Sequence, residues 1–117
     1  MKKILVIEDD AQYRELLKNG LEASGFYVEA VSDGESALHL LEHLEVDLII
    51  LDLILPRMDG IGFLYHLKND IRKDIPTIIL TNLERSAYPS GVRDFMIKSE
   101  VSVDEIAAKI KGLLGEV

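Results

Sequence analysis

Short apolar runs alternate with longer amphipathic segments along the whole chain. The runs are mostly continuous rather than alternating, which is typical of parallel strands whose sheet is covered by helices on both faces. The pattern predicts five strands, at Ile4–Ile7, Val28–Val31, Val46–Leu51, Thr77–Leu80 and Phe95–Ile97. Repeated strand–helix units of this kind predict an α/β fold with a doubly wound, mostly parallel sheet.

Two segments in the first half of the chain have helical periodicity. Apolar residues recur at helical spacing over residues 16–21, and Gly25 follows where a left-handed C-terminal cap is expected. In the next segment, Ser32 and Glu35 have the spacing of a capping box, which predicts that Ser32 caps the second helix. The apolar stripe of that helix is predicted to be Ala37, Leu38, Leu41 and Leu44.

Two further helices are predicted in the second half. The third begins after Gly60, and its apolar positions are Ile61, Leu64, Tyr65 and Leu67. Ser102 and Glu105 form a capping box for the last helix, whose apolar stripe is Ile106, Ile110, Leu113 and Leu114. Between Thr81 and Gly91 the chain is short and contains Pro89, so we expect a helical stub or a loop there.

Composition narrows the functional classes. A chain of 117 residues predicts one domain, spanning residues 1–117. The net charge of -8 repels phosphate backbones and anionic lipids, so we expect neither direct nucleic-acid binding nor a membrane partner. The absence of cysteine excludes a disulfide framework and fits a reducing compartment, which makes a cytoplasmic location the expectation.

Polar side chains stand at the carboxyl ends of four predicted strands. The acids Glu8–Asp10 follow the first strand, Asp52 follows the third, and Thr81 and Lys98 follow the fourth and fifth. Because the carboxyl ends of parallel strands border a common crevice where ligands bind, we expect these side chains to meet there.

The residue types at this edge indicate phosphoryl chemistry. Clustered carboxylates repel one another unless a cation neutralises them, and oxygen ligands with room for water suit Mg2+. Lys98 supplies a positive charge for a phosphoryl group, the Thr81 hydroxyl can donate to it, and Asp52 is the candidate nucleophile. Singly, each residue has an ordinary explanation, such as Asp10 capping the first helix, so the prediction rests on their conjunction.

The chain resembles the receiver domain of two-component response regulators over nearly its whole length. The resemblance rests on the segments Lys3–Asp10, Leu51–Gly60, Ile75–Thr81 and Asp94–Lys98. It implies a flavodoxin-like fold with five parallel strands in the order 2-1-3-4-5, helices on both faces, and a fourth helix that is shortened or absent.

The resemblance also implies a phosphoacceptor rather than an enzyme, with at most Mg2+-dependent self-phosphorylation and self-dephosphorylation. Asp52 would receive its phosphoryl group from a histidine kinase, a histidine phosphotransfer protein or a small phosphodonor. Mg2+ would be held by Asp9, Asp52 and the backbone carbonyl of Ile54, with Glu8 acting partly through water.

The signal would pass from the phosphoryl group to a downstream protein partner. In the resemblance, Thr81 and Phe95 are the switch residues: the hydroxyl moves toward the phosphoryl group and the ring repacks behind it. Asn82 stands where relatives carry a small residue, which predicts restricted access to the site. Ser99 stands where proline is common after a cis bond, and we expect a trans bond here because cis bonds before other residues are costly.

Two alternatives to a switching receiver stay open. The short segment before Gly91 fits an interaction scaffold that keeps the acid cluster but no longer switches. A small phosphatase working through an aspartyl phosphate usually has a second acid two residues after the nucleophile. That position is Ile54, which counts against a phosphatase.

Overall fold

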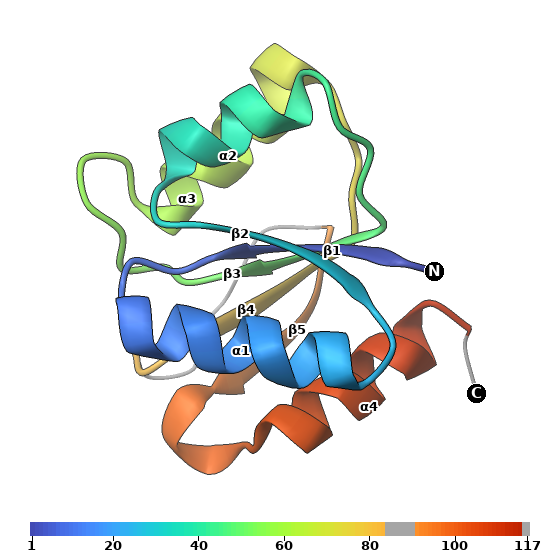
Figure 1. The fold of residues 1–117 in the computed structure, drawn as a ribbon. Helices are drawn as coiled ribbons and strands as arrows, with labels where there is room; N and C mark the ends of the chain where they lie inside the picture. The colour runs from blue at the N-terminus through green and yellow to red at the C-terminus, as the bar shows by residue number, and fades with distance from the viewer. Residues whose placement is uncertain (84–90, 116–117) are drawn as a thin grey trace.

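The computed structural model describes residues 1–83 and 91–115, and these form an α/β fold around one parallel sheet (Figure 1). The five strands lie in the order β2-β1-β3-β4-β5, which confirms the predicted fold class and strand order. Their bounds are Lys3–Ile7 for β1, Tyr27–Val31 for β2, Leu48–Leu51 for β3, Thr77–Thr81 for β4 and Val92–Ile97 for β5.

Helices cover both faces of this sheet. Helices α1 (Ala11–Ala23) and α4 (Val103–Leu113) lie on one face, and α2 (Gly34–Leu41) and α3 (Gly60–His66) lie on the other (Figure 1). A turn of π-helix, Leu67–Ile71, extends α3, and a short 3-10 turn, Lys98–Glu100, follows β5. Among the described residues, no helix is long and apolar enough to cross a membrane.

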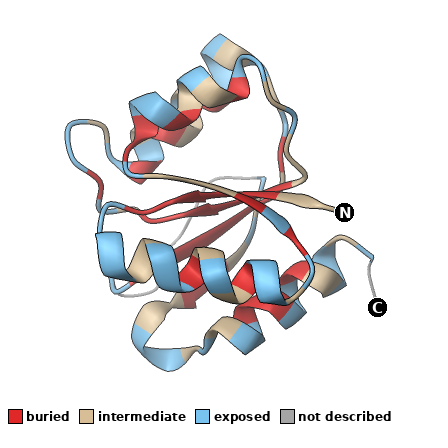
Figure 2. Cartoon of the chain, in the orientation of Figure 1, coloured by how far each residue is buried: buried red, intermediate tan, exposed pale blue. Residues whose placement is uncertain are grey.

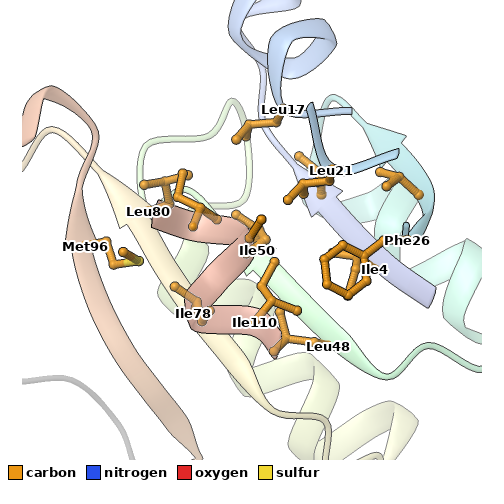
Figure 3. Close-up of a cluster of buried hydrophobic side chains, with 14 residues drawn as sticks. Ile4, Leu17, Leu21, Phe26, Leu48, Ile50, Ile78, Leu80, Met96 and Ile110 are labelled. Atoms are coloured by element: carbon orange, nitrogen blue, oxygen red, sulfur yellow. The ribbon is translucent and has the colours of Figure 1, made fainter. Parts of the chain in front are cut away.

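The three central strands, β1, β3 and β4, are almost entirely buried, which explains their continuous apolar sequences, whereas the edge strands β2 and β5 are partly exposed (Figure 2). Ile4 and Val6 of β1 point into the cluster under α1 and α4, whose members are drawn in Figure 3. Leu5 and Ile7 point into the cluster under α2 and α3. Alternate residues of one strand therefore supply two separate cores.

Several helix signals are confirmed by the backbone. Gly25 has a φ of 100° just after α1, in the left-handed region predicted for its cap. Ser102 and Glu105 make both hydrogen bonds of the capping box at the start of α4. The stub or loop expected between Thr81 and Gly91 falls mainly on residues 84–90, which lie outside the described residues.

The predicted cap of α2 is wrong by one residue. Asp33 is the N-cap, and its Oδ1 accepts a hydrogen bond of 2.8 Å from the Ser36 N–H. Ser32 instead donates its hydroxyl proton to Asp33 Oδ2. Both residue types can cap a helix, but the negative charge of the Asp33 carboxylate is also stabilised by the positive end of the helix dipole. The helix ends at Leu41, so Leu44 lies beyond it.

The predicted apolar face of α3 is also partly wrong. Ile61 and Tyr65 are 47% and 62% exposed, whereas Phe63 is fully buried. Leu67 is buried but belongs to the π turn. The helix is short, and its sequence has apolar residues on more than one side, so periodicity alone did not indicate which side faces the sheet.

Candidate functional site

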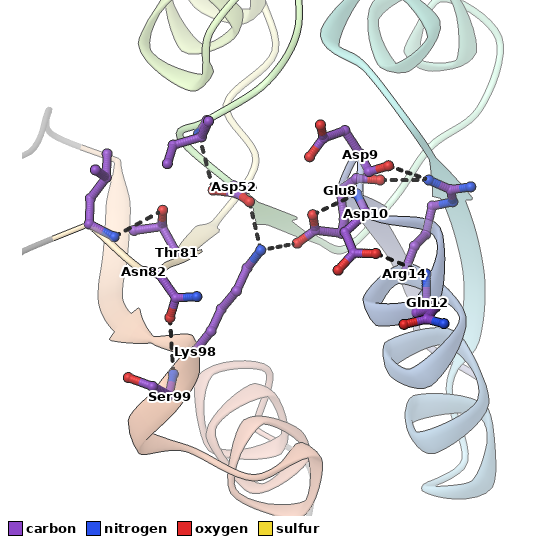
Figure 4. Close-up of polar contacts among 12 residues, drawn as sticks. Glu8, Asp9, Asp10, Gln12, Arg14, Asp52, Thr81, Asn82, Lys98 and Ser99 are labelled. Atoms are coloured by element: carbon purple, nitrogen blue, oxygen red, sulfur yellow. Dashed lines mark hydrogen bonds and ion pairs between the residues drawn. The ribbon is translucent and has the colours of Figure 1, made fainter.

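The register of the sheet brings the four polar strand ends together, as predicted. Ile7 pairs with Leu51, Leu51 with Ile79, and Thr81 with Ile97. Glu8, Asp52 and Lys98 each follow directly after one of these paired strands, and their side chains converge at one edge (Figure 4).

Asp52 is held from both sides. It is only 5% exposed, and Oδ2 accepts a hydrogen bond of 2.7 Å from Lys98 Nζ. Its other oxygen, Oδ1, accepts a bond of 3.1 Å from the Ile54 N–H. The carboxylate is therefore fixed in orientation before any ligand arrives.

Glu8 is the second buried acid of the site, at 2% exposure. Its Oε2 accepts a hydrogen bond of 3.0 Å from the Asp10 N–H, and its Oε1 forms an ion pair with Lys98. Burial raises the pKa of Glu8, and although Lys98 and the Asp10 N–H lower it, the pKa stays above the usual value.

Lys98 bridges the two buried carboxylates and is itself mostly enclosed, with 14% of its side chain exposed. Burial lowers the pKa of Lys98, but the hydrogen bonds to Asp52 and Glu8 outweigh burial and raise the pKa above its usual value. The ammonium therefore stays charged at neutral pH and can meet an anionic group at this edge.

The loop between β1 and α1 is shaped by two residues of the helix start. Asp10 caps α1 by accepting a hydrogen bond of 3.1 Å from the Gln12 N–H, as predicted. Arg14, which sequence reasoning missed, donates from Nη1 to the backbone carbonyls of Glu8, at 2.9 Å, and Asp9, at 3.3 Å. These bonds fix the backbone that carries the acid cluster.

Tyr13 is a further residue that sequence reasoning missed. Its half-buried ring packs against the core under α1, and Lys98 Nζ lies 4.8 Å from the ring centroid. Burial raises the pKa of the Tyr13 phenol. A signal was present in the sequence, because Tyr13 precedes the buried Leu17 and Leu21 at four-residue spacing and so begins the buried stripe of α1.

Three acids at this edge are suitably placed for a cation. Glu8, Asp9 and Asp52 each offer a carboxylate oxygen, and these oxygens lie within 4.8 Å of one another. The set is all oxygen, and Asp9 is exposed, which fits Mg2+ with retained waters. The structure gives the Ile54 N–H a bond to Asp52, while the predicted role of the Ile54 carbonyl stays a prediction.

The loop after Asp52 is packed tightly against the site. A Cβ on Gly60 would lie 2.7 Å from the backbone oxygen of Asp52 and 2.8 Å from Leu53 Cα, so only glycine fits. Arg57 has a left-handed φ of 65°, and its guanidinium lies 3.6 Å from Asp33 at the start of α2. The loop is thus held at its end by the packing of Gly60 and within it by the ion pair of Arg57 with Asp33.

The predicted switch residues are both buried, Thr81 as the last residue of β4 and Phe95 within β5. Thr81 is 0% exposed, and its Oγ1 accepts a long hydrogen bond of 3.5 Å from the Leu83 N–H. Phe95 is 1% exposed in this structure. Asn82 is exposed, and its Oδ1 accepts a bond of 3.2 Å from the Ser99 N–H. No cis bond occurs among the described residues, so the predicted trans bond before Ser99 is confirmed.

Comparison with known proteins gives consistent matches. The family model described as response regulator receiver domain matches residues 4–111. The DNA-binding dual master transcriptional regulator RpaA of Synechocystis is 36% identical over 97% of this chain and 49% of its own length. A probable transcriptional regulator, ycf27, of Guillardia theta is 34% identical over 97% of this chain and 45% of its own length. The chain thus spans about half the length of these curated relatives.

Solved structures agree with this fold. The receiver domain of the Francisella response regulator 1452 superposes with a TM-score of 0.87 at 29% identity, covering 98% of both chains. The response regulator TrrA of Thermotoga maritima, solved in complex with Mg(2+)-BeF, superposes with a TM-score of 0.84 at 34% identity, covering 97% of this chain and 99% of TrrA. With its fold, its strand-end residues and these matches, the chain belongs to the response regulator receiver domain family of two-component signalling.

Proposed function

We propose that this receiver accepts a phosphoryl group on Asp52 and passes the change to a protein partner. The observation that carries the proposal is the convergence of four side chains at the carboxyl ends of the strands. They are Glu8, Asp9, Asp52 and Lys98. A buried nucleophilic carboxylate, an acid cluster and a fixed ammonium are together what phosphoryl transfer to an aspartate requires. The phosphodonor would be a phosphohistidine of a histidine kinase or of a histidine phosphotransfer protein.

In the transfer step, a carboxylate oxygen of Asp52 forms a bond to phosphorus as the phosphorus–nitrogen bond of the phosphohistidine breaks. The electron pair of that bond leaves with the imidazole. Lys98, already 2.7 Å from Asp52, donates to an oxygen of the transferred group, and the Thr81 hydroxyl donates to another.

Glu8, Asp9, Asp52 and the Ile54 carbonyl would hold Mg2+ beside the transferred group. When bound, the cation neutralises the negative charge that develops on the phosphoryl oxygens. The TrrA structure, which was solved in complex with Mg(2+)-BeF, supports this assignment, because TrrA is 34% identical to this chain and covers 97% of it.

The response is proposed to begin at Thr81. Its hydroxyl turns toward the phosphoryl group, and Phe95 repacks in the space behind it. Such a pair is a two-state element that a local charge event can bias.

Incubation with acetyl phosphate and Mg2+ tests the proposal. Intact mass spectrometry should show one added phosphoryl group per chain, none with EDTA and none in Asp52→Asn. Asp59→Asn is the matched control: Asp59 caps α3 from the same loop, asparagine caps helices equally well, and this variant should still be modified. An unmodified wild-type chain would overturn the proposal.

A further inference from the structure

Among the residues that the structure describes, the ammonium of Lys98 makes three contacts, and they differ in kind. Two are with the carboxylates of Glu8 and Asp52. The third is with the ring face of Tyr13, whose centroid lies 4.8 Å from Nζ. A cation over an aromatic face is attracted by the ring quadrupole, most strongly where water is excluded.

The two carboxylate contacts depend on the state of the site. Glu8 and Asp52 are also members of the oxygen cluster that is suited to Mg2+. A dication among these oxygens neutralises the charge that holds Lys98, and it repels the ammonium directly. Loading the site therefore weakens both carboxylate contacts at the moment when Lys98 must face a phosphoryl group.

The Tyr13 contact does not depend on the metal in this way. The ring is neutral and lies outside the carboxylate cluster. It is fixed by α1, because Tyr13 packs against the core on the same buried stripe as Leu17 and Leu21. Its position is thus set by the fold, whatever occupies the acid cluster.

We propose that Tyr13 is a positioning residue for Lys98, and that its ring holds the ammonium at the site when the carboxylates are engaged by the metal. This inference rests on the proposed phosphoacceptor function. Tyr13 acts through Lys98 and does not itself touch the phosphoryl group.

Two variants separate this role from simple packing. Tyr13→Phe keeps the ring face, and Tyr13→Leu keeps apolar bulk without it. With acetyl phosphate at saturating Mg2+, Tyr13→Phe should be phosphorylated within about twofold of the wild-type rate, and Tyr13→Leu about five- to tenfold more slowly. The matched control is Tyr27→Leu, because Lys3 lies 5.6 Å from the ring centroid of Tyr27, away from the site. It should leave the rate unchanged.

A readout without turnover tests the same contact. The Lys98 side-chain methylene protons beside Nζ should show an upfield ring-current shift by NMR that persists when Mg2+ is added. The shift should be lost in Tyr13→Leu and kept in Tyr13→Phe.

The proposal is overturned if Mg2+ abolishes the shift in the wild type, or if Tyr13→Leu is phosphorylated at the wild-type rate. An equal slowing in Tyr13→Phe and Tyr13→Leu would also overturn it, since the ring face would then not be the cause. If the wild type accepts no phosphoryl group, the proposed function fails, while the ring-current measurement still decides the contact.

Discussion

Two parts of the strand-end edge are held in different ways. The acceptor half is defined as Glu8, Asp9, Asp52 and Lys98. Lys98 contacts the carboxylates of Glu8 and Asp52, the latter at 2.7 Å, and a carboxylate oxygen of Asp9 lies within 4.8 Å of both acids. The response half, defined as Thr81 and Phe95, is buried in the sheet, and within residues 1–83 and 91–115 the Thr81 hydroxyl accepts one long hydrogen bond of 3.5 Å. The acceptor half is therefore preorganised for phosphoryl transfer. Turning the Thr81 hydroxyl, by contrast, breaks a long hydrogen bond that contributes little to stability.

The largest difference between the acceptor half and the response half is expected in how strongly their variants slow phosphorylation. Lys98→Met removes the donor that meets the phosphoryl oxygens and should slow modification by acetyl phosphate about 100-fold. Thr81→Val removes a weaker, neutral donor and should slow it by about tenfold or less. Time courses of intact mass at saturating Mg2+ measure both. Equal losses in the two variants would break the distinction between the halves.

In the absence of metal, the buried ion pairs of the acceptor half should contribute more to stability than an exposed ion pair elsewhere in the chain. Lys98→Met removes the cation that faces two buried carboxylates and should lower the free energy of unfolding by about 3 kcal/mol. Lys109→Met breaks an ion pair with Asp94 in which the lysine side chain is 44% exposed, and it should cost less than about 0.5 kcal/mol. Urea unfolding in EDTA gives both values.

Added Mg2+ should restore much of the loss in Lys98→Met, because the cation neutralises the same carboxylates. It should leave Lys109→Met unaffected. A loss in Lys98→Met that does not depend on Mg2+ would argue against a shared cluster.

The response half should change most when the acceptor half is loaded. With Mg2+ and beryllofluoride, the backbone amide resonances of Thr81 and Phe95 should shift, whereas those of β2 at the far edge of the sheet should not. Asp52→Asn is the control and should show neither binding nor shifts. Loading that leaves Thr81 and Phe95 unmoved would identify a scaffold that binds without switching.

The smallest effect expected is a dependence on pH. Because the pKa of Glu8 is raised above 4.5, chiefly by burial, its contribution to stability is present below that value and is lost as the pH rises through the raised pKa. Glu8→Gln has no such titration, so in EDTA it should gain stability relative to wild type as the pH rises from 4.5 toward neutrality. A stability difference that stays constant over this range would contradict the raised pKa.

The fold and the acceptor half were predictable for a physical reason. Strands buried on both faces have continuous apolar sequences, and their register then places Glu8, Asp52 and Lys98 at one edge without further information. Functional residues at strand ends can therefore be predicted from their positions in the sequence.

What the sequence did not predict depends on directions around a helix. Tyr13 and Arg14 are adjacent in α1, yet the Tyr13 ring faces Lys98, whereas Arg14 donates a hydrogen bond to the backbone of the loop between β1 and α1. In α3, the exposed Ile61 and the buried Phe63 are both apolar, and packing alone selects between them. For α2, Ser32 and Asp33 are adjacent residues that cap helices equally well, so the sequence did not indicate that Asp33 is the N-cap.

The central claim is that Asp52 carries the phosphoryl group, and reductive trapping tests it most directly. Sodium borohydride reduces an aspartyl phosphate to homoserine, which peptide mass spectrometry can locate. After treatment with acetyl phosphate and Mg2+, we predict homoserine at position 52 and unmodified acids at Glu8, Asp9 and Asp10. A reduced residue at one of those acids, or a phosphoryl group that resists borohydride, would contradict the account.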